Sequence, residues 1–151
     1  MHLAELNIAR MLYPLDDPRM ADFAAALDHV NAVAERSEGF VWRLKSEGAA
    51  ANQDTSDHML LVNLTVWESA ETLEHYVWQT VHKRIYNQKG KWFEAPKDAH
   101  FVMWAVEEGH IPTLAEAFER LEYLKQNGPS DHAHAWEGLP HLKIWMQQQC
   151  G

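Results

Sequence analysis

The sequence has a single cysteine, few basic residues and no long apolar run. One cysteine, Cys150, cannot close an intrachain disulfide, which is typical of a reducing compartment. The 13 Lys and Arg face 22 Asp and Glu, a formal net charge of -9, whereas nucleic acids and anionic membranes attract clustered basic side chains. No signal peptide and no membrane span are recognisable. We therefore expect a cytoplasmic protein that binds neither nucleic acid nor membranes.

The remaining composition is that of an ordinary globular protein. Hydrophobic residues make up 46% of the 151 residues, which is enough for a substantial core in one domain. Seven tryptophans and ten histidines are unusual for this length. The aromatic residues fit two interpretations, a heavy core or the wall of a pocket for a flat ligand.

Hydrophobic periodicity predicts four strands and three helices. Period-two alternation marks the strands, and apolar residues at spacings of three and four mark the helices. The expected strands cover residues 2–10, 40–45, 59–67 and 100–107, and the expected helices run from 18 to about 37, from 69 to about 88 and from 113 to 127. Asp17 and Thr113 are expected N-caps, and Asn127-Gly128-Pro129 is a stop signal. The small, polar segment 46–57 is expected to be a flexible loop.

Alternation also assigns faces to the strands. In the strand 40–45, Phe40, Trp42 and Leu44 should share one face, with Arg43 on the other. The strands 2–10 and 59–67 each have one aliphatic face and one face with polar groups, the latter carrying Asn7, Asn63, Thr65 and Trp67. Buried amides need partners, so we expect Asn7, Asn63 and Trp67 to line one cavity on the helix-covered side of a sheet. In the alternative arrangement these residues lie in a dimer interface.

The order strand, helix, strand, strand, helix, strand predicts an α+β, ferredoxin-like βαββαβ antiparallel sheet with two helices on one face. A third helix and a C-terminal arm are added to it, which gives a domain of residues 1–129 and an arm of residues 130–151 packed on the same domain. We expect the second sheet face to be left uncovered by this chain's own helices. We expect a homodimer to cover it, because such an apolar face is larger than monomers usually expose.

Several motifs resemble a bacterial domain-of-unknown-function family in the dimeric α/β-barrel superfamily, which also contains the antibiotic-biosynthesis monooxygenases. The matching segments are GFVWRL at 39–44, LTVWES at 64–69, His82, KWFE at 91–94, WAVEEGHIPTLAEAFERL at 104–121 and NGPS at 127–130. The resemblance covers about residues 2–136 and implies the dimeric α/β-barrel fold and a dimer. It implies no single reaction, because this superfamily contains cofactor-free monooxygenases, haem-degrading enzymes, isomerases and binding proteins.

The resemblance also implies a set of site residues. Haem-degrading members have an Asn, Trp and His arrangement similar to Asn7, Trp67 and a helix histidine, either His75 or His82, in which the histidine ligates iron. Cofactor-free members use similar side chains to orient a phenolic substrate. The structural alternative is that the asparagines pair across a dimer, Trp67 is core and the histidines are solvated.

Helical geometry separates the two histidines. Seven residues apart, His75 and His82 lie about 10 Å from each other along the axis and cannot share a metal ion. Glu71, one turn before His75, either orients it or forms an ordinary surface pair with it. His82 lies between Trp78 and Ile85 at helical spacing, so we expect it to be partly buried and prefer it as the site histidine.

Other candidate binding residues surround this set. Trp42, Trp78 and Trp104 are expected to supply aromatic walls, and Arg43 either clamps a substrate carboxylate or pairs with Glu5 or Glu68. Lys91-Trp92-Phe93 fits either a lid or a hydrophobic anchor. His132-x-His134 lacks further ligands at metal spacing, so no metal site is predicted.

These observations favour a small monooxygenase-like or isomerase-like protein that acts on a planar aromatic or polyketide-like molecule, either without a cofactor or with haem. The expected catalytic residues are His82, Asn7 and Trp67. The alternative is a non-catalytic protein that binds a small molecule or haem, or a dimeric interaction module.

Overall fold

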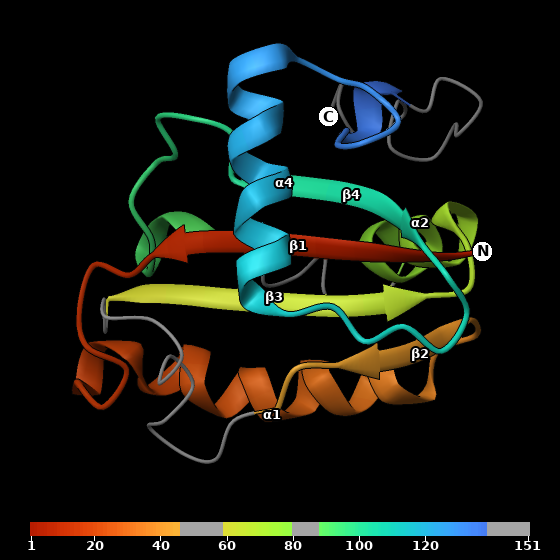
Figure 1. The fold of residues 1–151 in the computed structure, drawn as a ribbon. Coiled ribbons are helices and arrows are strands. Elements are labelled where there is room, and N and C mark those ends of the chain that lie inside the picture. Colours follow the sequence, from red (N-terminus) through yellow and green to blue (C-terminus); the bar gives the residue numbers. More distant parts are fainter. Residues whose placement is uncertain (46–58, 80–87, 139–151) are drawn as a thin grey trace.

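A computed structural model describes residues 1–45, 59–79 and 88–138 of the chain. Within them it has a four-stranded antiparallel sheet and three α-helices, a mixed α+β architecture. The strands are β1 (His2–Arg10), β2 (Phe40–Arg43), β3 (Leu60–Trp67) and β4 (Phe101–Val106), and the helices are α1 (Ala21–Arg36), α2 (Ala70–Gln79) and α4 (Leu114–Asn127). The sheet order is β2-β3-β1-β4 (Figure 1).

The helices lie on both faces of the sheet. Residues of α1 and α2 pack with Leu3, Trp67 and Met103 on one face, which we call the helix-pair face. On the other face, which we call the α4 face, α4 runs across the strands in front of the sheet (Figure 1). The expectation that this second face is left uncovered is therefore wrong. The helical pattern of residues 114–124 showed that α4 has an apolar side, but not which surface that side covers.

Strand alternation decides which residues reach each face. Even-numbered residues of β1, β3 and β4 form a compact core beneath α4; its fully buried members are Ala4, Leu6, Leu64, Val66, Val102 and Trp104. From α4, Ala117, Leu121 and Leu124 complete this core. It contains almost only aliphatic and aromatic groups, as the alternation of β1 and β3 predicted.

β2 departs from simple alternation. Phe40 lies opposite Trp67, and Trp42 lies opposite Val66, so the register shifts between Phe40 and Trp42. A bulge of this kind adds one residue to a strand and reverses the faces beyond it. The expectation that Phe40 and Trp42 share a face is wrong for this reason. Phe40 packs on the helix-pair face and Trp42 on the α4 face.

Most of the expected caps and boundaries are confirmed. Asp17 caps the short 3₁₀ helix η1 (Pro18–Met20), which leads into α1. Thr113 Oγ1 accepts a hydrogen bond from Glu116 N at 3.1 Å, and Gly128, at φ 76°, ends α4. The predicted loop 46–57, the second half of the predicted helix 69–88 and the last part of the predicted arm lie outside the described residues.

A third cluster closes one end of the molecule. Trp92, just after η3 (Lys89–Lys91), packs with Met11, Met20 and Phe23. The ring of Phe23 lies 5.4 Å from that of Trp92 and 5.0 Å from that of Phe93. The Lys91-Trp92-Phe93 segment is therefore a hydrophobic anchor. None of the described helices is both long enough and apolar enough to span a membrane.

Candidate functional site

The helix-pair face carries polar side chains in two adjacent rows across the sheet. In the first row, Glu5 lies opposite Thr65 on β3 and Met103 on β4. In the second, which we call the amide row, Asn7 lies opposite Asn63 and Phe101. The α4 face has no comparable rows among the described residues. The polar groups of the strands are therefore concentrated beside α1 and α2.

A chain of hydrogen bonds joins these residues. Trp67 Nε1 donates to Thr65 Oγ1 at 3.0 Å, and this hydroxyl donates to Glu5 Oε2 at 2.7 Å. Asn7 Nδ2 donates to the other carboxyl oxygen, Glu5 Oε1. Glu5 thus accepts from both sides and connects Trp67 with Asn7, although only 2% of its surface is exposed.

Burial sets the protonation behaviour of Glu5. Loss of solvent raises the pKa of its carboxyl to about 7, and the hydrogen bonds from Asn7 and Thr65 oppose this shift only in part. A carboxyl with a pKa in this range exchanges its proton near neutral pH. Such groups are common in sites that move protons, although buried structural networks contain them as well.

The Trp67 end of this chain is closed. The Trp67 ring lies 5.5 Å from that of Phe40 and 5.1 Å from that of Tyr76, and only 1% of the residue is exposed. Tyr76 OH donates to Val30 O of α1 at 3.1 Å. Burial, followed by the nearby charge of Glu5, raises the pKa of Tyr76 far above its ordinary value. Trp67 is therefore a core residue that supports the hydrogen-bond chain.

The Asn7 end is more open. Asn7, Asn63 and Phe101 are each partly exposed. The Asn7 amide is oriented with Nδ2 toward Glu5, to which it donates a hydrogen bond. This leaves the second Nδ2 hydrogen and Oδ1 for other contacts, and within the described part of the chain neither has a partner. The amide row is consequently the part of the network that can meet a ligand.

Aromatic rings flank the amide row. Trp136, at the start of the 3₁₀ helix η4 (Trp136–Gly138), stacks on Phe101 with ring centroids 5.4 Å apart and an interplanar angle of 20°. The Trp78 ring of α2 lies 6.5 Å from that of Trp136. Amide groups beside planar aromatic surfaces are typical of sites for flat molecules with few polar groups.

The structure brings Asn7, Asn63 and Trp67 to one face, with Trp78 at its α2 side. It separates Trp42 and Trp104 from them, because both tryptophans pack on the α4 face. A single pocket lined by Trp67 together with Trp42 or Trp104 is therefore excluded. The sheet itself lies between them.

The remaining candidates differ in position. Arg43 Nε lies 3.0 Å from Glu35 Oε1 of α1, so its partner is neither Glu5 nor Glu68. His75 is exposed, while the buried side of α2 carries Leu73, Glu74 and Tyr76. His82 lies outside the described residues.

The sequence reasoning did not identify Glu5 as a site residue. It treated Glu5 only as a partner for Arg43, although Glu5 alternates with Leu3 and Asn7 on one side of β1. A carboxylate on the inward face of an apolar strand is the signal that could have revealed it, because such a group is rarely buried without hydrogen-bonding partners.

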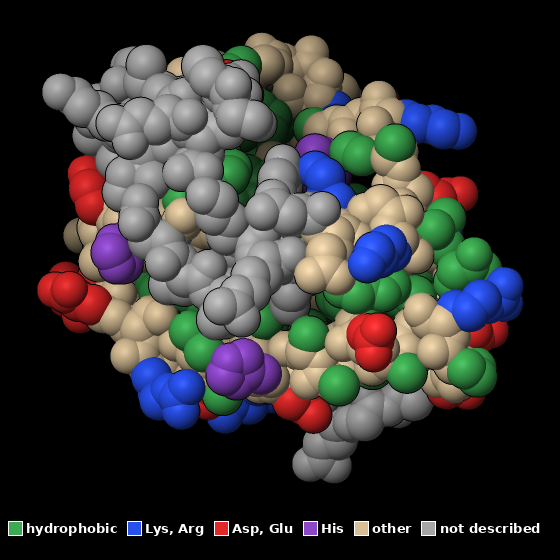
Figure 2. Space-filling view, turned by 180° about the vertical axis from the view of Figure 1, so that it is seen from behind, with side chains coloured by type: hydrophobic (Ala, Val, Ile, Leu, Met, Phe, Trp, Pro, Cys, Tyr) green, Lys and Arg blue, Asp and Glu red, His purple; other side chains and the backbone are tan. Residues whose placement is uncertain are grey.

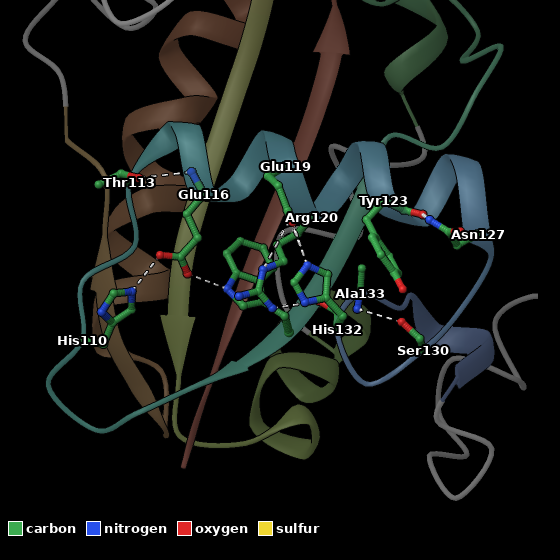
Figure 3. Close-up of polar contacts among 11 residues, drawn as sticks. His110, Thr113, Glu116, Glu119, Arg120, Tyr123, Asn127, Ser130, His132 and Ala133 are labelled. Atoms are coloured by element: carbon green, nitrogen blue, oxygen red, sulfur yellow. Dashed lines mark hydrogen bonds and ion pairs between the residues drawn. The ribbon is translucent and has the colours of Figure 1, made fainter.

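A second polar cluster lies along α4 (Figure 3). Glu116 accepts a hydrogen bond from Trp104 Nε1 at 2.8 Å and lies 2.8 Å from His110 Nε2. Burial alone raises the pKa of Glu116, but the bonds from His110 and Trp104 outweigh it and hold this pKa below its ordinary value. In a capping box, the glutamate side chain would accept a hydrogen bond from the backbone N–H of the N-cap residue. Here the Glu116 side chain contacts His110 and Trp104 instead, and it thereby ties the 107–113 segment to the core.

Further along α4, Glu119 lies 2.9 Å from His132 Nε2, and Tyr123 packs against the His132 ring at 4.6 Å. No group of three or more metal-binding side chains occurs among the described residues. The described surface of the helix-pair side mixes acidic, basic and hydrophobic groups without a patch of one sign (Figure 2).

A shallow groove lies at the edge of the sheet near β2. It has a volume of about 460 Å³ and is lined by Trp42, Leu44, Ile111, Pro112, Thr113 and Leu114. Its walls are mostly apolar and carry no acid–base side chain. This groove offers contact surface and little chemistry.

Comparison with known proteins gives one match. No match was found among curated proteins or among solved structures. A family model described as Domain of unknown function (DUF3291) matches residues 2–149, nearly the whole chain. This agrees with the resemblance to a domain-of-unknown-function family, and the chain belongs to the DUF3291 family.

Proposed function

We propose that the protein binds a planar aromatic or polyketide-like molecule at the amide row and acts on it as a small monooxygenase or isomerase. The observation that carries the proposal is the Glu5–Asn7 pair, in which a buried carboxyl fixes a partly exposed amide. Fixed amides beside aromatic rings suit a ligand that has a flat body and a phenolic or enolic oxygen.

The chemistry follows from the atoms of the Asn7 amide that have no partner among the described residues. A phenol or enol that loses its proton to solvent becomes an oxyanion, and the second Nδ2 hydrogen of Asn7 can donate to that oxygen. In an isomerase a proton from solvent adds to a carbon of this anion instead of to the oxygen, which gives the keto tautomer. In a monooxygenase, molecular oxygen accepts the electron pair of the anion, a CH₂ group becomes a carbonyl, and the second oxygen atom leaves as water. Glu5 acts here as a positioning residue, because it reaches the ligand only through Asn7.

Haem is the second form of this proposal. Of the described histidines, His75 is exposed on α2 and His134 pairs with Met103 at the outer edge of β4. The haem form is assigned to His82, the histidine preferred from the sequence. Titration with haemin tests it, since a Soret shift that is lost in His82→Ala and kept in His75→Ala supports haem, and the absence of any shift excludes it.

Turnover of a hydroxyanthrone under air tests the cofactor-free form. We expect the wild-type protein to bind this planar phenol and to consume oxygen above the protein-free rate. Asn7→Ala should lower kcat by at least about tenfold, because it removes the oxyanion donor. Asn127→Ala is the matched control, since the Asn127 amide donates to Tyr123 O at the far end of α4. Equal rates in wild type and Asn7→Ala would refute the assignment.

A non-catalytic binding protein is the second candidate function. It is favoured by the burial of Glu5, which leaves amides as the exposed polar groups of the row within the described residues. Binding of the hydroxyanthrone that depends on Asn7, without oxygen uptake or an isomerised product, would select this candidate.

We also propose that the fold is ferredoxin-like, that the chain belongs to the dimeric α/β-barrel superfamily and that it forms a homodimer. The antiparallel order β2-β3-β1-β4 supports the first point. For the dimer, α4 covers mainly β4 and β1, and the partly exposed Trp42 and Leu44 remain beside the groove near β2. Sedimentation at micromolar concentration tests the dimer, and a monomer that persists at about 100 μM would contradict it.

A further inference from the structure

Residues 130–137, which we call the strap, link the two faces of the molecule. The strap begins beside α4, where Arg120 Nη1 donates to His132 O at 3.0 Å and Glu119 lies 2.9 Å from His132 Nε2 (Figure 3). Ala133, the next residue, is fully buried in the core beneath α4. The start of the strap is therefore fixed by polar contacts and by packing.

The strap then passes the outer edge of β4. Met103 N donates to His134 O at 2.7 Å, and His134 N donates to Met103 O at 3.1 Å. This pair of bonds continues the sheet by one residue beyond β4. Because successive residues of an extended segment point to opposite faces, Ala133 and Ala135 pack with the core beneath α4, whereas Trp136 packs with the cluster on the helix-pair face.

On the helix-pair face the strap places Trp136 against the amide row. Its indole stacks on Phe101, which lies opposite Asn7 in the β1–β4 register. Trp136 is partly exposed, as are Phe101 and Asn7. A tryptophan that served only to cover Phe101 would need no exposed surface, whereas an indole that stacks on a ligand needs one.

We propose that Trp136 is a specificity-determining residue of the ligand site at the amide row, where its indole stacks on a planar aromatic ligand. This inference rests on the proposed function. Stacked aromatic pairs are favourable because of their ring quadrupoles, so a flat ligand gains an interaction that a non-planar one of equal size does not. Arg120 and Glu119 are positioning residues, because they hold the strap from the other face.

Two probes of similar size separate stacking from general apolar contact: 1,8-dihydroxyanthraquinone, which is planar, and a saturated perhydroanthracene diol, which is not. The measurement is Kd by isothermal calorimetry for wild type, Trp136→Leu and Trp136→Phe. We expect Trp136→Leu to weaken the planar probe about tenfold and the saturated probe less than about twofold, while Trp136→Phe keeps the planar probe within about threefold of wild type. Tyr13→Leu, which removes a ring that packs with Arg19, is the control and should change neither Kd.

Arg120→Met tests the strap without altering Trp136. It should increase hydrogen exchange at Met103 N, which bonds to the strap, and should reduce the ratio of planar to saturated affinity by about threefold. Where Trp136→Leu does not fold, Arg120→Met still decides the proposal through this ratio. An unchanged ratio of planar to saturated affinity in Arg120→Met would then overturn it.

The outcomes also distinguish this inference from the proposed function. If wild type binds the planar probe and Asn7→Ala weakens that binding while Trp136→Leu leaves it unchanged, the assignment of Trp136 is wrong and the amide row remains the site. If wild type binds neither probe, the proposed function fails and the role of Trp136 fails with it.

Discussion

The two faces of the sheet are buried in chemically different ways. Under α4, the described strand residues form an aliphatic and aromatic core, and the Trp104–Glu116 hydrogen bond at its margin is only partly buried. Under α1 and α2, a carboxyl, a hydroxyl, an indole N–H and an amide form one hydrogen-bonded chain. A buried network of this kind contributes little net stability and is costly when one member is left unpaired. We therefore expect the α4 face to contribute more to stability, whereas the proposed ligand site lies on the helix-pair face.

The substitution with the largest expected effect on the free energy of unfolding tests whether the α4 face stabilises the fold. Trp104→Ala removes a fully buried indole and should lower the free energy of unfolding by about 3–5 kcal/mol. Urea denaturation of the purified variant measures this loss. Glu122→Ala, at an exposed position of α4, is the control and should change stability by less than about 0.5 kcal/mol. A loss below about 1 kcal/mol in Trp104→Ala would show that the α4 face is not the main core.

The pH dependence of stability tests the helix-pair face. Burial raises the pKa of Glu5 from 4.5 to about 7, so between these values the unfolded chain is ionised at this residue while the folded chain still holds the proton. Stability should therefore fall as pH rises from about 4.5 to about 7, by on the order of 3 kcal/mol, and level off above that. Glu5→Gln should remove this part of the pH dependence.

Urea unfolding at several pH values, compared between wild type and Glu5→Gln, gives the difference directly. Glu107→Gln, at an exposed glutamate, serves as the control and should follow the wild-type curve. Parallel curves for wild type and Glu5→Gln would mean that Glu5 does not hold its proton in the folded protein.

Local sequence patterns predicted the strands and helices, but they did not predict all of the contacts between them. Strand alternation and helical spacing located β1, β3, β4 and α4, because each has a strong apolar face of its own. The bulge in β2 is invisible to such a pattern, since FVWRLK alternates equally well in either register. This is why Phe40 and Trp42 were expected on the same face.

The candidate site shows the same limit. Asn7, Asn63 and Trp67 could be assigned to one face because all three are odd-numbered residues of their strands, and every second residue of a strand points to the same face. The carboxyl that joins Asn7 to Trp67 depends on Thr65, which lies 60 residues from Glu5 in the chain. Trp136 reaches the face only through the edge contact of His134, and the sequence beyond residue 130 has no period that could have predicted this path.

Gly39 tests how closely the helix-pair face is packed away from the amide row. Its φ is 83°, and a Cβ added there would lie 2.4 Å from Thr72 of α2. Gly39→Ala combines backbone strain with a clash and should cost roughly 2–3 kcal/mol. Gly109→Ala has a similar φ of 88° with nothing within 4 Å of the added Cβ, so it measures the strain alone, about 1 kcal/mol. Equal losses in thermal or urea unfolding would show that α2 yields at this point and that the face is loosely packed along its whole length.

The smallest effect concerns the attachment of α4. Thr113 Oγ1 accepts the bond from Glu116 N that caps this helix, and the Glu116 side chain is already used by Trp104 and His110. Thr113→Ala should therefore cost only about 1 kcal/mol, the usual value for a lost N-cap, because the other contacts of Glu116 remain. Thr113→Ser keeps the accepting hydroxyl and should unfold in urea as wild type does. A loss of 3 kcal/mol or more in Thr113→Ala would mean that the cap also positions Glu116 for Trp104, and that the α4 face depends on a polar network as much as the helix-pair face does.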